Sequence, residues 1–118
     1  MEFNQIRWHD SVIKNIVIDR NCPGKKDIIK LEIEWNSSKK GGLIFEDVYW
    51  SGMNFNFGIV ADETIMDASA LSADDEDLLK LYLNWKETLN DVRLTAYKIN
   101  LNSTGNEIKI ISKSFKVY

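Results

Sequence analysis

The strictest pattern in this chain is the alternation of apolar and polar residues over two segments, 29–35 and 53–59. In the first, large apolar side chains alternate with charged ones: Ile29, Leu31, Ile33 and Trp35 with Lys30, Glu32 and Glu34. In the second, apolar side chains at every odd position are separated by asparagine or glycine. Successive side chains of a strand point to opposite faces of a sheet, so this pattern indicates half-buried strands. The chain is therefore expected to form a sheet with one buried and one solvated face.

Further strands are predicted over 11–19, 42–50, 94–101 and 107–118, with a short one over 64–66 inside an irregular loop. Turns rich in Gly, Asn, Ser and Lys separate them. We expect Ser51-Gly52 to interrupt the sheet as a turn or bulge before the strand 53–59. The last two strands are expected to form a hairpin around the turn 102–106.

One main helix is predicted over Asp74–Asn90. Apolar side chains recur there at spacings of three and four, at Leu78, Leu81, Tyr82, Trp85 and Leu89. A serine at position 72, three residues before an aspartate, resembles a capping box at the helix start.

The helix is expected to bury Leu78, Tyr82 and Trp85 against Met53, Phe55 or Phe57. The predicted fold class is α+β: a curved, mostly antiparallel sheet of about six strands, with one main helix (about 74–90) packed on it.

The length of 118 residues favours a single domain, 1–118. No apolar stretch near the N-terminus resembles a signal peptide, and no run is long enough to span a membrane. The lone Cys22 cannot form an internal disulfide. We therefore expect a reduced, cytoplasmic protein that does not bind membranes. The mild net charge of −3 also argues against nucleic acid, because such binding requires clustered Lys and Arg.

Negative charge is concentrated in one part of the chain. Residues 58–79 contain seven acids and no Lys or Arg. One or two acids at a helix start are explained by the helix dipole, but a surplus is self-repelling unless it attracts a basic partner. We therefore predict a surface that binds a basic protein. Its candidate acidic residues are Asp62, Glu63, Asp67, Asp74, Asp75 and Asp77.

Aromatic residues supply the other binding candidates, Tyr49 and Trp50. Because they are adjacent on a predicted strand, one must face away from the other, and the exposed one would be a binding hot spot. Trp35 and Phe55 lie in the apolar phase of their strands and are expected in the core. If all four were exposed, they could instead form the sugar-stacking surface of a carbohydrate-binding module.

Catalytic chemistry has only weak support in the sequence. His9 and Asp10 are adjacent, and neighbours on a strand point to opposite faces, so the two need not touch. Ser11 is too close in sequence to serve easily as the nucleophile of a triad. Glu46 and Asp47 are also adjacent and face apart, and either could pair with a neighbouring Lys. No metal-ligand spacing or EF-hand loop is present. We predict no catalytic, metal or cofactor site. The alternative is a small hydrolase that uses His9 with Asp10 or Glu46.

The segment Trp8-His9-Asp10-Ser11-Val12-Ile13, followed by Ile16-Val17-Ile18 and Leu31-Glu-Ile-Glu-Trp, resembles small uncharacterised bacterial "WHDS-x-I" domains. The resemblance covers mainly the first half of the chain. Some of these domains are grouped with the immunity proteins of polymorphic toxins. The resemblance implies a non-enzymatic, protein-binding domain that binds and inhibits a cognate toxin. It carries over no binding residues, because partner surfaces vary within such groups.

Overall fold

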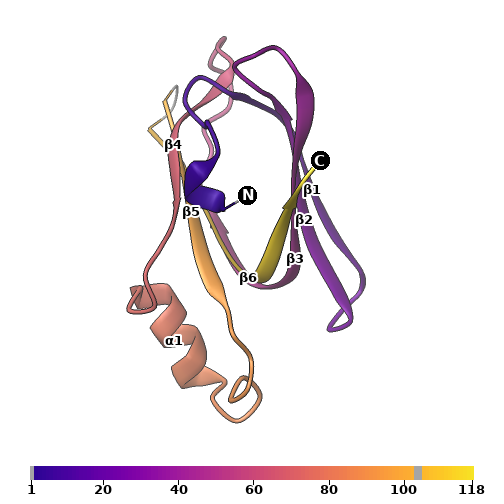
Figure 1. The fold of residues 1–118 in the computed structure, drawn as a ribbon, viewed down its shortest axis with the longest axis vertical. Coiled ribbons are helices and arrows are strands. Elements are labelled where there is room, and N and C mark those ends of the chain that lie inside the picture. The colour runs from indigo at the N-terminus through magenta and orange to yellow at the C-terminus, as the bar shows by residue number, and fades with distance from the viewer. Residues whose placement is uncertain (1, 103–104) are drawn as a thin grey trace.

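The computed structural model describes residues 2–102 and 105–118 (Figure 1). Its elements, in chain order, are η1 (Phe3–Gln5, a 3-10 turn), β1 (Val12–Cys22), β2 (Lys26–Glu34), β3 (Lys40–Met53), β4 (Glu63–Ala70), α1 (Glu76–Asn84), β5 (Thr95–Leu101) and β6 (Glu107–Val117). The predicted turn at 102–106 includes Ser103 and Thr104, which lie outside the described residues.

The six strands form one closed antiparallel barrel in the order β1-β2-β3-β6-β5-β4. The predicted α+β class, with about six antiparallel strands and one main helix, is confirmed. Closure of the sheet into a barrel was not predicted, and the pairing that closes it is short. β1 and β4 pair only at Val12 with Thr64 and Ile13 with Glu63, whereas β1 and β2 pair along almost their whole length.

The apolar side chains of the alternating strands fill the barrel interior. Ile29, Leu31 and Ile33 of β2 are buried, as the sequence predicts, and the polar residues between them are partly exposed. Leu43 and Phe45 of β3 and the odd-numbered apolar residues of β5 join the same core. The interior is therefore packed with side chains and is not a channel.

The N-terminal segment fills the side of the barrel where β1 and β4 separate (Figure 1). Phe3 is buried, with its ring centroid 4.8 Å from that of Trp8, 4.7 Å from Tyr97 and 5.3 Å from Phe115. The side-chain oxygen of Asn4 accepts a hydrogen bond of 2.8 Å from the backbone N–H of Ala70, on β4. The segment therefore completes the core and covers part of the β4 edge.

The helix is shorter than predicted. Asp75 is its N-cap, because the Asp75 carboxylate accepts a hydrogen bond of 3.1 Å from the backbone N–H of Leu78. The predicted cap at Ser72 is therefore wrong by three residues. After Asn84 the chain forms irregular turns that bury Leu89 and reverse its direction toward β5. In the described part of the chain no helix is long and apolar enough to cross a membrane.

The helix lies at one end of the barrel, beside β5, and not over the predicted residues Met53, Phe55 or Phe57 (Figure 1). Its buried Leu78 packs with Leu89, Leu94, Ala96 and Ile111 in a second, smaller core. Ala96 and Ile111 lie opposite each other on β5 and β6, so this core covers the outer face of those strands. Tyr82 is partly buried, but Trp85 is 59% exposed, and its predicted burial is wrong.

The predicted strand over 53–59 is also wrong. β3 continues without a break through Ser51-Gly52 and ends at Met53. The final ladder bond runs from the backbone N–H of Asn54 to the carbonyl of Glu107, where β6 begins. Residues 54–62 therefore have no strand to pair with, and they form an irregular loop in which Phe57 is 90% exposed. The predicted short strand at 64–66 is confirmed as part of the longer β4.

Candidate functional site

The candidate binding surface surrounds an irregularity in β3. Between Val48 and Trp50 the pairing with β6 shifts by one residue, so Tyr49 is the extra residue of a bulge. Asp47, just before it, has a φ of 52°, in the left-handed region that Asp tolerates better than most residues. Tyr49 is 41% and Trp50 37% exposed. Strict alternation predicted that one of the two would face away, and the bulge is the reason that both are exposed.

Gly52 makes room for the ring of Trp50. A Cβ atom at Gly52 would lie 2.8 Å from the Cη2 atom of that ring. The indole therefore extends along the outer face of β3 instead of projecting freely into solvent. The predicted interruption at Ser51-Gly52 is wrong, because the strand bulges at Tyr49 and continues through Gly52.

A hollow of about 460 Å³ lies beside the two aromatic residues. The end of the β1–β2 hairpin forms one wall through Ile18, Arg20 and Asp27, and residues 47–51 of β3 form the other. Ile18 is exposed and Val48 is partly buried, so the lining includes apolar surface. Its volume is within the range typical of ligand sites in proteins, roughly 300–1,000 Å³.

The charges in this hollow do not cancel. The Nε of Arg20 donates a hydrogen bond of 2.8 Å to Asp27, which also accepts one of 3.1 Å from the backbone N–H of Gly24. The Arg20 side chain, and next the Gly24 N–H, hold the pKa of Asp27 below its usual range. The carboxylate of Asp47 has no hydrogen-bond or ion-pair partner in residues 2–102 and 105–118. The lining therefore carries one uncompensated negative charge.

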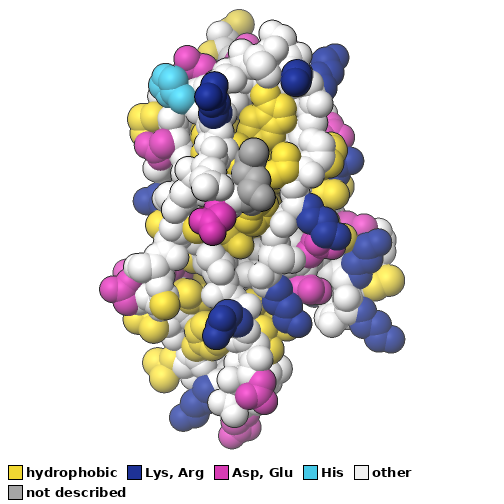
Figure 2. Space-filling view, in the orientation of Figure 1, with side chains coloured by type: hydrophobic (Ala, Val, Ile, Leu, Met, Phe, Trp, Pro, Cys, Tyr) yellow, Lys and Arg dark blue, Asp and Glu magenta, His cyan; other side chains and the backbone are white. Residues whose placement is uncertain are grey.

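The predicted acidic residues divide between two places. Asp62 precedes β4, Glu63 begins it, and Asp67 lies within it. Lys14 lies 3.9 Å from Asp62, and Asp67 accepts a hydrogen bond of 2.7 Å from the side chain of Asn100. Asp74, Asp75 and Asp77 instead lie at the start of α1. Basic and acidic side chains are also interspersed on the face seen in Figure 2. The structure therefore does not gather all six acids into one patch.

Lys109 binds two of the acids at the helix start. Its Nζ lies 2.7 Å from Asp75 and 2.6 Å from Asp77. Burial alone would raise the pKa of Asp75, but the hydrogen bonds from Lys109 and the Leu78 backbone outweigh it and lower that pKa. Burial would likewise lower the pKa of Lys109, and the two carboxylates outweigh it and raise it. These two acids therefore attach the helix to β6.

Strand pairing brings this cluster close to the aromatic residues. Gly52 lies opposite Lys109, and Trp50 lies opposite Ile111. Lys109 and Ile111 are both on the outer face, under the start of the helix and its core. The indole of Trp50 and the carboxylates at the helix start therefore share one side of the barrel, although 25 residues separate Trp50 from Asp75 in the sequence.

Trp8-His9-Asp10-Ser11 forms a turn that leads into β1. The backbone N–H of Ser11 donates to the carbonyl of Trp8, and Asp10 has a positive φ of 65°. The buried hydroxyl of Ser11 donates to the carbonyl of Arg7 and accepts from the backbone N–H of Asn36. His9 and Asp10 are exposed, with 3.5 Å between Nε2 and Oδ2. The serine hydroxyl therefore has structural partners and does not extend a His-Asp pair.

Glu46, the other acid considered for hydrolysis, has an ion-pair partner. Glu46 pairs with Lys116 at 3.2 Å, which confirms the expectation that one of the acids on this strand binds a neighbouring Lys. The part of the chain that the structure describes contains no group of three His, Cys, Asp or Glu side chains that could hold a metal ion. Trp35 and Phe55, the other aromatic candidates, are partly buried against the core.

A larger hollow, of about 650 Å³, lies on the outer face of β1, β2 and β3. Lysines and glutamates line it and pair with each other, Lys14 with Glu34 at 3.8 Å and Lys30 with Glu32 at 3.9 Å. Four of its five charged side chains are paired, which leaves less for recognition than in the smaller hollow, where two exposed aromatic residues adjoin a carboxylate that has no partner among the described residues.

Sequence reasoning identified Tyr49 and Trp50 by residue type but missed Ile18, Arg20 and Asp27, and it considered Asp47 only as an acid beside Glu46 that could pair with a lysine. The first three belong to a hairpin that approaches β3 only in the folded barrel. The bulge that exposes the aromatic residues has no sequence signal of its own. No protein-family model matches this chain, and no curated protein matches it either.

Proposed function

We propose that this chain is a non-enzymatic protein-binding domain that inhibits a basic protein, as an immunity protein inhibits its cognate toxin. The observation that carries the proposal is the exposure of Tyr49 and Trp50 on the β3 bulge, beside a hollow with an uncompensated negative charge. Tyr and Trp are enriched among residues that dominate binding energy. The resemblance of the N-terminal segment to "WHDS-x-I" domains supports the same class of function.

Charge favours a basic partner. The chain has a net charge of −3, and its acids occur at the start of β4 and again at the start of α1. Such a distribution accelerates encounter with a positively charged protein. Toxins that act on nucleic acid are basic because their substrate is a polyanion. This class of toxin is therefore the partner that we propose.

Growth protection tests this function. The protein encoded next to this chain in its genome is expressed in a bacterial host, alone and together with this chain. We expect expression alone to stop growth and co-expression to restore it, and we expect Trp50→Ala to remove protection at equal protein level. Growth arrest that this chain does not relieve, or a harmless neighbouring product, would argue against an immunity function.

Carbohydrate binding is a second candidate, because the same exposed Tyr49 and Trp50 rings could stack on a sugar. A glycan array probed with the wild-type chain and with Trp50→Ala distinguishes the two. Saturable binding to one glycan class that is lost in the variant would favour this alternative over protein inhibition.

A further inference from the structure

We propose that the hollow beside Asp47, Tyr49 and Trp50 binds one arginine side chain of the partner protein. The inference rests on the proposed function and deepens it, because it names the chemical group that the site accepts. It starts from the geometry of the β3 bulge, which places an acid and two aromatic residues in the lining of the same hollow.

The charge of the lining selects a cation. Arg20 and Asp27 compensate each other at 2.8 Å, and the carboxylate of Asp47 has no partner in the described residues. A cationic group that enters the hollow can therefore pair with the carboxylate of Asp47 without breaking an existing ion pair. An anionic group would meet the repulsion of Asp47, and the positive charge of Arg20 is already paired with Asp27.

The aromatic residues select guanidinium among cations. A guanidinium group is planar, stacks on the faces of Trp and Tyr, and can donate two parallel hydrogen bonds to one carboxylate. The hollow has about 460 Å³ of space, and Ile18 and Val48 add apolar surface against which the methylene groups of an arginine can pack. Lysine would gain the charge interaction but not the stacking or the paired hydrogen bonds.

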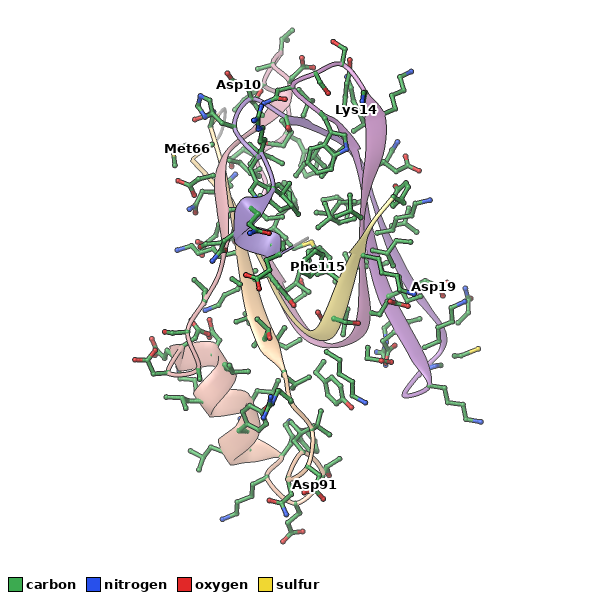
Figure 3. All side chains as sticks on the ribbon, viewed as in Figure 1. Asp10, Lys14, Asp19, Met66, Asp91 and Phe115 are labelled. Atoms are coloured by element: carbon green, nitrogen blue, oxygen red, sulfur yellow. The ribbon has the colours of Figure 1, made fainter. Side chains whose placement is uncertain are left out.

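The backbone makes Asp47 a suitable position for a clean test. Its φ of 52° is a conformation that asparagine, like aspartate, adopts readily. Asp47→Asn therefore removes the charge and keeps the turn of the chain. The matched control is Asp91→Asn, which makes the same change in net charge at an exposed position that does not line the hollow and lies at the far tip beyond α1 (Figure 3).

The experiment is an NMR titration of the ¹⁵N-labelled chain with methylguanidinium chloride at constant ionic strength. Parallel titrations use N-methylurea, which is planar and neutral, and sodium acetate. We expect saturable shifts of the Trp50 indole N–H and of the amides of 47–51 with methylguanidinium only. Asp47→Asn should weaken this binding about two- to fivefold, and Asp91→Asn should leave it unchanged.

Several results would overturn the inference: no saturable shift with methylguanidinium, equal shifts with N-methylurea, tighter binding of acetate, or an unchanged affinity in Asp47→Asn. The spectrum of each variant reports whether it is folded. Because the titration needs no toxin, the two proposals can fail separately. Growth protection without methylguanidinium binding would support the proposed function and contradict the arginine site. Methylguanidinium binding without growth protection would support the arginine site and contradict the proposed function.

Discussion

Lys109 places its ammonium group between Asp75 and Asp77 with only 13% of its side chain exposed, and Asp75 is 12% exposed. Lys98, directly opposite Lys109 on β5, pairs instead with Glu107 at 3.1 Å, and both of those side chains are more exposed. Two neighbouring lysines on one face of the barrel therefore have different roles. One joins the helix to the sheet, and the other belongs to a solvated pair.

Lys109→Met should lower the free energy of unfolding by about 2–4 kcal/mol, because it leaves the largely buried carboxylate of Asp75 without its cation. Lys98→Met should lower it by less than about 1 kcal/mol, as expected for an exposed ion pair. Urea denaturation of both variants at neutral pH measures the difference. Equal losses would mean that the Lys109 cluster does not secure the helix.

The pH dependence of this loss follows from the two pKa shifts. The pKa of Asp75 is lowered in the folded protein, so its contribution is present above its unfolded pKa and is lost as pH falls through the folded pKa. The pKa of Lys109 is raised, so its contribution is present below its unfolded pKa and is lost as pH rises through the folded pKa. The stability gap between wild type and Lys109→Met should therefore be largest near neutral pH and shrink in acid and in strong base. Denaturation at about pH 3, 7 and 11 tests this expectation, and a gap that widens in acid would contradict it.

Residues 2–11 act as part of the barrel although they form no strand. Phe3 contributes its ring to the aromatic cluster inside the barrel, where β1 and β4 diverge after two paired positions. Phe3→Ala should cost about 3–5 kcal/mol, as a large-to-small change in a core. The matched control is Phe57→Ala on the exposed 54–62 loop, which should change stability by less than about 0.5 kcal/mol. Thermal unfolding of both variants checks this, and a small loss at Phe3 would show that the barrel does not need this segment.

The helix buries most of the face that its spacing predicted, because Leu78 is buried and Leu81 and Tyr82 pack against the same core. Trp85 is the exception: it lies just past the end of α1 and is exposed. Leu78→Ala should therefore destabilise the chain by about 2–5 kcal/mol, and Trp85→Ala by less than about 1 kcal/mol. Denaturant midpoints of the two variants give the comparison. A larger loss of stability in Trp85→Ala than in Leu78→Ala would support the burial of Trp85 that the sequence predicted.

Two segments with the same alternation show how far sequence reasoning extends. Residues 29–35 and 53–59 alternate equally well, but only the first has strands on both sides, β1 and β3. Alternation shows that a segment can form a half-buried strand, but whether it does so depends on a neighbouring strand with which it can pair. The same limit applies to the site. Tyr49 and Trp50 are recognisable by residue type, whereas the bulge and the approach of the β1–β2 hairpin depend on contacts between distant segments.

At the scale of the whole molecule, the barrel carries two groups of acids and one exposed aromatic pair, which lies at the bulge in β3. The acids at the start of β4 and at the start of α1 contribute to long-range attraction. Short-range affinity depends instead on well-packed aromatic contacts, and Tyr49, Trp50 and the adjoining hollow supply these. Attraction and affinity are therefore expected to arise from different parts of the surface.

The affinity of this chain for the protein encoded beside it, measured by titration calorimetry, separates those contributions. Trp50→Ala should weaken binding by at least about tenfold, because truncating a central aromatic contact typically costs more than about 1.4 kcal/mol. Phe57→Ala, which removes an even more exposed ring from the 54–62 loop, should bind as tightly as wild type. Unchanged affinity in Trp50→Ala, or a loss confined to Phe57→Ala, would contradict a binding surface at the β3 bulge.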